Sequence, residues 1–183
     1  MAEKGQIRIA LAGNPNCGKT TMFNNITGAK QHVGNYAGVT VEKKEGYKKF
    51  DGHELLFIDL PGTYSLTARS LDELVARNVI VNDNPDVIVN VLDASNLERN
   101  LYLAAQLLEL EKPMVIALNM SDVAEDMGIK YDLKKMAEMT GATIVSTVGR
   151  TNIGTKELLE ATVSVAASQK APGVTTVSYT HLT

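Results

Sequence analysis

The chain has 183 residues, of which 44% are hydrophobic and 21% charged, and this suits one globular domain with a substantial core. The formal net charge of −3 gives no basic field for nucleic acid, so we expect no nucleic-acid partner. A single cysteine cannot form an internal disulfide, and no apolar run reaches the length of a membrane span. The first residues also lack a secretory pattern, so we expect a soluble, cytoplasmic chain.

Short apolar runs alternate with longer amphipathic segments along the chain. Strands are predicted at 6–12, 54–59, 86–92, 113–119 and 142–146, and helices at 19–27, 71–82, 97–110, 133–140 and 155–167. Uninterrupted apolar runs are typical of parallel strands that are buried on both faces. Residues 39–50 instead alternate apolar and charged side chains before the turn pair Asp51-Gly52, which predicts one antiparallel edge strand. The predicted fold class is α/β, with about six strands and helices on both faces of the sheet.

The segment Gly-Asn-Pro-Asn-Cys-Gly-Lys-Thr, residues 13–20, lies between the first predicted strand and the first predicted helix. Its spacing is that of a phosphate-binding loop. The glycines let successive N–H groups point inward, Lys19 reaches the terminal phosphates, and Thr20 offers a hydroxyl to Mg²⁺. A glycine turn that binds nothing is the alternative, and the strand–loop–helix order favours the phosphate loop. The loop alone leaves kinase, ATPase and GTPase open.

A second motif, Asp59-Leu60-Pro61-Gly62, ends the strand predicted at 54–59. Asp59 at a strand tip can hold Mg²⁺ through water, and the N–H of Gly62 can meet a γ-phosphate. By itself the motif is also a common turn. Its position after the phosphate loop favours the nucleotide-binding interpretation.

A third motif, Asn119-Met120-Ser121-Asp122, follows the strand predicted at 113–119. The Asp122 carboxylate can accept from the ring N–H and the exocyclic amine of guanine, whereas adenine would leave it facing an acceptor. Asn119 is expected to brace the loops around the base. A helix cap by Asp122 or Ser121 is an alternative role that fits the same geometry. The motif predicts GTP and GDP as ligands and opposes an adenine-specific enzyme.

Three segments resemble the cytosolic G domain of the ferrous iron transport protein B family, a family of P-loop GTPases. Residues 32–42, His-Val-Gly-Asn-Tyr-Ala-Gly-Val-Thr-Val-Glu, are similar to its first switch, and residues 59–66 to its second switch. Residues 90–103 are also similar to the corresponding part of that family. The resemblance covers 6–167, so we expect the G domain over residues 1–168. Residues 169–183 are expected to be disordered or an expression remnant.

The resemblance implies specific roles for individual positions. Thr40 would bind Mg²⁺ together with Thr20 and Asp59, and Lys19, Asn16, Thr40 and Gly62 would serve catalysis. The segment 145–148 would stack under guanine and offer it a backbone N–H. The implied nucleotide contacts are Gly13, Asn14, Pro15, Asn16, Cys17, Gly18, Lys19, Thr20, Thr21, Gly38, Val39, Thr40, Asp59, Gly62, Asn119, Met120, Asp122, Ser146, Thr147 and Val148.

Two positions differ from the commonest GTPase pattern. Met120 stands where many GTPases have lysine, which removes a charge-assisted link to the phosphate loop and predicts weaker nucleotide retention. Thr63 follows the second-switch glycine, where many small GTPases place a water-orienting glutamine. The chain therefore resembles relatives that use K⁺, with Asn16 as the candidate ligand. A loop-stabilising side chain is the alternative role for Asn16.

The resemblance also implies partners outside this chain. In that family a helical domain and a polytopic membrane domain for ferrous iron follow the G domain, which would place this chain at the cytoplasmic face of the cell membrane. His32, His53, His181 and Cys17 show no metal-ligand spacing, so iron is expected as cargo and not as a ligand here. The rival hypothesis is a ribosome- or tRNA-associated regulatory GTPase. Oligomeric state is left open.

Overall fold

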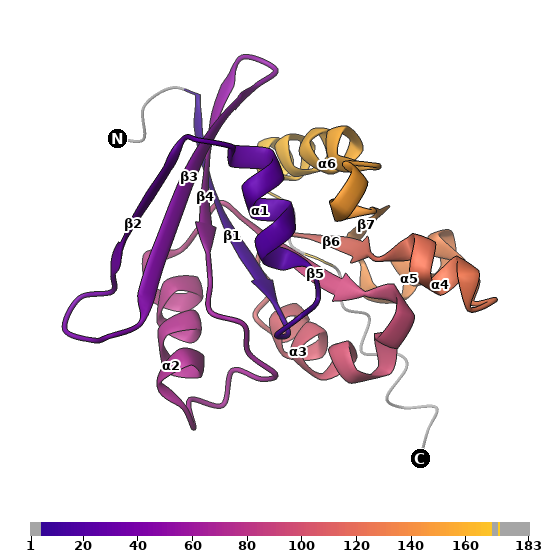
Figure 1. Cartoon of the computed structure of the whole chain (residues 1–183), viewed down its shortest axis with the longest axis horizontal. Helices are drawn as coiled ribbons and strands as arrows, with labels where there is room; N and C mark the ends of the chain where they lie inside the picture. Colours follow the sequence, from indigo (N-terminus) through magenta and orange to yellow (C-terminus); the bar gives the residue numbers. More distant parts are fainter. Residues whose placement is uncertain (1–4, 170–171, 173–183) are drawn as a thin grey trace.

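The computed structural model describes residues 5–169 and 172, in which one mixed sheet is covered by helices (Figure 1). The strands are β1 Gln6–Gly13, β2 Gln31–Asn35, β3 Glu42–Phe50, β4 His53–Asp59, β5 Val87–Asp93, β6 Met114–Asn119 and β7 Thr143–Ser146. Their order in the sheet is β2-β3-β4-β1-β5-β6-β7. The pairs of β1 with β4 and β5, of β5 with β6, and of β6 with β7 are parallel, and β3 is antiparallel to both of its neighbours.

The predicted fold class is confirmed, and the antiparallel strand lies where the sequence predicted it. The sheet has seven strands and not about six, because β2 pairs with β3 and takes the outer position. The segment Gln-His-Val-Gly-Asn of β2 contains one apolar residue and its side chains are mostly exposed. Backbone pairing with β3 therefore holds this strand, and no hydrophobic pattern reveals it.

The helices are α1 Lys19–Thr27, α2 Leu71–Asn78, α3 Leu97–Glu109, α4 Ser121–Asp126, α5 Leu133–Thr140 and α6 Thr155–Ser168. Short 3-10 turns occur at Ala94–Asn96 and Gly149–Thr151. The helix predicted at 71–82 ends at Asn78 and continues as a π-helical turn, Val79–Asp83. Helix α4 was not predicted, because six residues are too few to show a periodic pattern.

Hydrophobic side chains pack on both faces of the sheet. One cluster joins Ala10 and Ile88 to residues of α2, α3 and α4, including Leu103. The other joins Ile9 and Phe23 to residues of α1 and α6. Alternate residues of β1 and β5 enter opposite clusters, which explains why apolar residues occupy both faces of these strands.

Helix α1 approaches strand β3 closely at its C-terminal end. A Cβ atom on Gly46 would overlap the side chain of Thr27, the last residue of α1. The Thr27 hydroxyl donates to the Phe23 carbonyl oxygen at 2.7 Å, which fixes this side chain against its own helix. The absence of a side chain at position 46 therefore allows α1 to lie against the sheet here.

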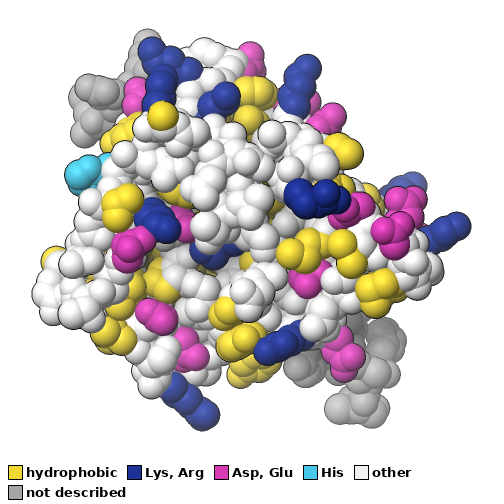
Figure 2. Space-filling model, in the orientation of Figure 1, with side chains coloured by type: hydrophobic (Ala, Val, Ile, Leu, Met, Phe, Trp, Pro, Cys, Tyr) yellow, Lys and Arg dark blue, Asp and Glu magenta, His cyan; other side chains and the backbone are white. Residues whose placement is uncertain are grey.

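The three predicted motifs lie at one edge of the sheet. Parallel strands β1, β4 and β6 end at Gly13, Asp59 and Asn119, and the carboxyl ends of parallel strands share an edge. On the face shown in Figure 2, Lys and Arg side chains are interspersed with Asp and Glu. Among the described residues, no helix combines the length and the hydrophobicity needed to cross a bilayer.

Candidate functional site

The loop between β1 and α1 has the shape of a phosphate-binding loop. Gly18 precedes α1 with φ 88°, and Asn16 has φ 65°, both in the left-handed region. A Cβ on Gly18 would overlap the Asn119 amide, so the close approach of the loop to β6 requires glycine. A cavity of about 360 Å³, here called the loop cavity, is lined by Asn14, Pro15, Asn16, Gly18, Lys19, Thr20, Thr21 and Gly62. The helix N-terminus that faces this loop favours anions.

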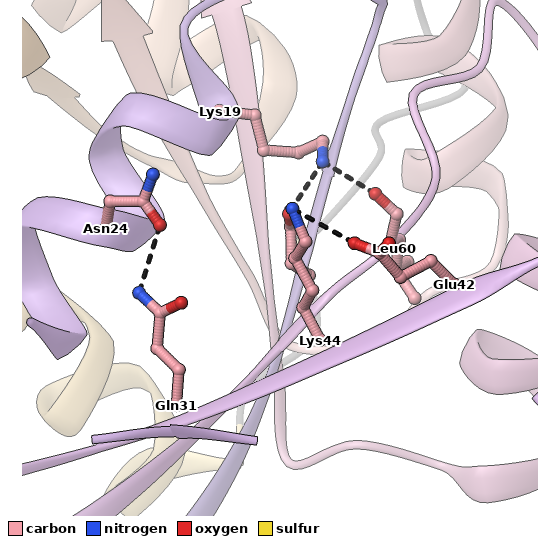
Figure 3. A network of polar contacts seen from close by, with 7 residues as sticks. Lys19, Asn24, Gln31, Glu42, Lys44 and Leu60 are labelled. Atoms are coloured by element: carbon pink, nitrogen blue, oxygen red, sulfur yellow. Dashed lines mark hydrogen bonds and ion pairs between the residues drawn. The ribbon is translucent and has the colours of Figure 1, made fainter. Parts of the chain in front are cut away.

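Lys19 is held in a buried ion pair. Its Nζ lies 2.5 Å from Oδ1 of Asp59 and 2.6 Å from the carbonyl oxygen of Leu60. In Figure 3, the Lys19 side chain extends from α1 toward Leu60. The two charged side chains are 8% and 7% exposed. The sequence assigned Lys19 to phosphate and Asp59 to magnesium, and the structure pairs them with each other.

The three residues predicted to hold Mg²⁺ line one cavity. This switch cavity of about 530 Å³ is lined by Lys19, Thr20, Thr40, Val41, Glu42, Lys44, Asp59, Leu60, Pro61, Gly62, Leu71 and Asp72. Two hydroxyls and one carboxylate are oxygen ligands of the kind that Mg²⁺ prefers. The donor set of Thr20, Thr40 and Asp59 therefore fits the ion. Gly38 and Val39, which were predicted to contact the nucleotide, belong to the turn before Thr40 and not to the cavity wall.

The first switch has an anchor that its sequence did not indicate. Tyr36 packs against the hydrophobic cluster under α2 and α3, and its N–H donates to the Val41 carbonyl oxygen at 3.0 Å. Burial raises the pKa of the Tyr36 phenol above its ordinary value. The Val39 N–H donates to the Tyr36 carbonyl oxygen at 3.2 Å. A tight turn around Gly38 thus leads from an anchored residue to Thr40.

Asn16 has an exposed side chain beside the loop cavity. Within the described part of the chain, no hydrogen bond involves its amide group. The φ of 65° at Asn16 lies in the left-handed region that asparagine tolerates, which fits the alternative in which Asn16 only stabilises the loop. An amide oxygen that is not engaged elsewhere fits a K⁺ ligand.

The second switch is attached to the phosphate loop and to α3. The Thr63 N–H donates to the Gly13 carbonyl oxygen at 3.1 Å, and the Thr63 side chain is buried. Asn14 Nδ2 donates to the Arg99 carbonyl oxygen at 2.9 Å. The Arg99 guanidinium lies 5.1 Å from the Tyr64 ring centroid and donates to its hydroxyl at 3.0 Å. Thr63 thus contributes its backbone here and has no long side chain to orient water.

Asn119, the last residue of β6, connects the phosphate loop to the loop after β7. Its Nδ2 donates to the Cys17 carbonyl oxygen at 3.0 Å. Its Oδ1 accepts from Thr147 Oγ1 at 3.0 Å and from the Gly149 N–H at 2.9 Å. Asn119 is 2% exposed, so these bonds lie away from water. The phosphate loop and the loop after β7 are therefore held at fixed positions relative to each other.

The segment predicted to contact guanine, Ser146 to Val148, directs its donors to the protein itself. The Thr147 N–H donates to the Leu118 carbonyl oxygen and the Val148 N–H to the Ile153 carbonyl oxygen, each at 2.9 Å. A base carbonyl would have to take one of these N–H groups from its present acceptor. Ser121 does not cap α4; its hydroxyl donates to the Thr147 carbonyl oxygen at 3.0 Å.

Asp122 lies in the first turn of α4 and forms an ion pair that the sequence did not predict. Arg150 Nη2 donates to Oδ2 of Asp122 at 3.0 Å, and this holds the pKa of the Asp122 carboxyl below its ordinary value. Met120 precedes α4 in the left-handed conformation, with φ 56° and no side-chain cap. Its terminal methyl lies near Gly18, so it packs on the phosphate loop.

Cys17 is 1% exposed, and burial raises the pKa of its thiol to about 11. It is therefore a small core side chain and not a reactive thiol.

No group of three or more His, Cys, Asp or Glu side chains within residues 5–169 could hold a metal. His181 and most of the predicted tail lie outside the described residues.

A sequence model of the family described as "Ferrous iron transport protein B" matches residues 7–162. The Fe(2+) transporter FeoB of Salmonella typhimurium is 49% identical over 157 residues, which is 84% of this chain and 20% of that protein. A fusion of Fe(2+) transport protein A with FeoB from Porphyromonas gingivalis is 51% identical over 160 residues, or 87% of this chain and 19% of that protein. The chain thus spans about a fifth of the length of these relatives.

Solved structures agree with these matches. The cytosolic domain of L. pneumophila FeoB is 47% identical with a TM-score of 0.85, covering 90% of this chain and 65% of that one. The T. maritima cytosolic domain, solved in a GMPPNP form, is 42% identical with a TM-score of 0.88, covering 90% and 66%. The G domain from Methanococcus jannaschii FeoB is 42% identical with a TM-score of 0.79, covering 90% and 99%. The chain is a G domain of the ferrous iron transport protein B family.

Proposed function

We propose that this chain binds GTP and GDP with Mg²⁺, hydrolyses GTP slowly, and changes the conformation of its two switches with the nucleotide. The main support is the switch cavity, where Lys19, Thr20, Thr40, Asp59 and Gly62 meet at the carboxyl edge of the sheet. T. maritima FeoB has been solved in GDP and GMPPNP forms, which is consistent with a guanine-nucleotide site.

Nucleotide binding begins with an exchange of partners at Lys19. Phosphate oxygens replace the Asp59 carboxylate and the Leu60 carbonyl oxygen around its ammonium group. The exchange frees the Asp59 carboxylate, which lines the same cavity as the hydroxyls of Thr20 and Thr40, and these three side chains would then hold Mg²⁺. Lys19 release and metal binding are therefore linked, because the same carboxylate serves both.

Hydrolysis needs charge and positioning more than covalent chemistry. Lys19 and the loop N–H groups face the negative charge that develops on the transferred phosphoryl group. When bound, Mg²⁺ and K⁺ would supply further positive charge, held by Thr20, Thr40 and Asp59 and by Asn16 respectively. Water is positioned by backbone groups near Gly62, because the Thr63 side chain is buried.

The cargo of the full-length protein is ferrous iron in this proposal. The curated relatives are named Fe(2+) transporters, and this chain corresponds to about a fifth of their length. The remaining partners would be a helical domain and a membrane domain, with the chain at the cytoplasmic face. The family match favours this assignment over a ribosome- or tRNA-associated GTPase.

Displacement of labelled GDP by unlabelled nucleotides tests the base assignment. GDP should compete at least about 100-fold better than ADP, since a carboxylate facing adenine would be left unpaired. Asp122→Ala should erase that preference. Asp126→Ala, which removes an exposed carboxylate from the same helix, is the matched control and should retain it. Equal competition by ADP against the unmodified chain would overturn the proposal.

A further inference from the structure

The segment after β7 engages two groups that a guanine base would need. Arg150 Nη2 donates to Oδ2 of Asp122 at 3.0 Å, and the Ile153 carbonyl oxygen accepts from the Val148 N–H at 2.9 Å. Both Arg150 and Ile153 come from a single stretch of four residues that begins within a 3-10 turn, Gly149–Thr151. The acceptor and a donor of the base site are thus both satisfied from within the chain.

The chemistry of these two contacts matches that of a guanine edge. Guanine presents a ring N–H and an exocyclic amine as donors and a carbonyl oxygen as an acceptor. The guanidinium of Arg150 presents planar N–H donors to the same carboxylate, and Ile153 presents a carbonyl oxygen. Arg150 and a guanine base would therefore both donate to the Asp122 carboxylate, and this is where they compete.

The Arg150 side chain can leave Asp122 at little cost. It is 77% exposed and Asp122 is 33% exposed, and the structure shows one hydrogen bond between them. Water solvates both groups when they separate, so neither becomes a buried unpaired charge. Arg150 is therefore displaceable, unlike the buried Lys19.

We infer that Arg150 competes with the guanine ring for the Asp122 carboxylate and thereby lowers the affinity of this site for guanine nucleotides. This rests on the proposed function. Arg150 would have the opposite effect if its positive charge attracted the anionic nucleotide and so raised the affinity. The two roles predict changes of opposite sign when the charge is removed.

The test is the Kd of labelled GDP for the whole chain and for Arg150→Gln. Exposed ion pairs are worth about 0.2–1 kcal/mol, so the variant should bind GDP about 1.4- to 5-fold more tightly. The ratio should approach one at about 1 M salt, where the Debye length is about 3 Å and the exposed pair is screened. Lys156→Gln removes the same charge from the exposed start of α6 and should leave the affinity unchanged. Weaker or equal binding by Arg150→Gln would overturn the inference.

A second pair of variants isolates the contact from the net charge. Asp122→Asn replaces the carboxylate with an amide, which can donate to the C2 carbonyl of xanthine in place of the guanine amine. In this background Arg150 has lost its anionic partner. Adding Arg150→Gln should therefore leave the Kd of XDP unchanged, whereas an equal gain in both backgrounds would show that the effect does not run through Asp122.

The outcomes distinguish a failure of the proposed function from a failure of the Arg150 competition. If the unmodified chain does not prefer GDP to ADP, the proposed function fails. If it prefers GDP but Arg150→Gln binds no more tightly, the proposed function stands and only the competition is wrong.

Discussion

Lys19 and Asp59 form a buried ion pair at the phosphate end of the site, whereas Arg150 and Asp122 form an exposed pair at the base end. The first pair is at most 8% exposed on either side chain, and the second is 77% and 33% exposed. Both pairs occupy groups that the nucleotide would use. They differ in what happens when a ligand takes one partner away.

A buried charge must always have a partner, so the phosphate end can only exchange one partner for another. In the proposed function, phosphate and a metal cation would together provide that exchange, because Lys19 would gain an anion and Asp59 a cation. At the base end, water serves as the temporary partner and a single group can move alone. The comparison indicates that ligands at the phosphate end act together, whereas affinity at the base end can be adjusted by one surface residue.

Potassium dependence would give the largest effect at the phosphate end. A positive charge supplied to the transferred phosphoryl group can be worth about 10³ or more in rate. We expect GTP turnover to rise more than about tenfold when K⁺ replaces Na⁺ at constant ionic strength. Asn16→Ala should abolish the rise in turnover and nearly retain GDP binding. The control variant Asn82→Ala, at an exposed position, should keep the rise in turnover. The same turnover in both salts would contradict ion assistance.

The stability of the nucleotide-free chain tests the contrast between the pairs directly. Lys19→Met leaves Asp59 buried without a cation, which should lower the free energy of unfolding by about 3–5 kcal/mol. Arg150→Gln should change it by less than about 0.5 kcal/mol. Urea unfolding measures both. Adding Asp59→Asn to Lys19→Met should restore part of the loss, and equal effects of the two single variants would break the comparison.

Hydrogen exchange of the first switch gives the smallest expected difference. Residues 37–40 should exchange about tenfold more slowly with a GTP analogue than with GDP, because only the γ-phosphate and Mg²⁺ hold Thr40. Tyr36 is anchored in the hydrophobic cluster, so its amide should be similarly protected in both states. Mass spectrometry measures the hydrogen exchange of residues 37–40 and of the Tyr36 amide. Uniform protection across 34–40 in the two states would show that this loop does not sense the nucleotide.

Contiguous apolar runs let the sequence predict the parallel strands, and amphipathic segments let it predict most of the helices. The edge strand at 31–35 was not predicted, because it is held by backbone pairing and carries almost no hydrophobic pattern. Within the site, the bracing role of Asn119 followed from its position at a strand end. The sequence predicted Lys19 as a phosphate ligand and Asp59 as a magnesium ligand, and both line the switch cavity. Their pairing with each other depends on side-chain directions that spacing does not encode.

The Arg150–Asp122 pair was missed for a different reason. The two residues are 28 positions apart and meet only because β6 and β7 are neighbours in the sheet. Arg150 also lies in a segment with no regular pattern, so neither its direction nor its partner could be read from the sequence. The signal that could have found it is the proximity of a cation to the loop after the last core strand.

Gly46 shows that the geometry of the phosphate loop is also set from its far side. Helix α1 starts at Lys19 and ends at Thr27, and Thr27 rests where a Cβ on Gly46 would lie. A methyl group at position 46 would push the C-terminal end of α1 away from the sheet, because it would overlap the Thr27 side chain. Because Lys19 and Thr20, which are proposed to bind phosphate and Mg²⁺, lie at the other end of α1, a substitution in strand β3 would tilt these two residues rather than cause only a local defect.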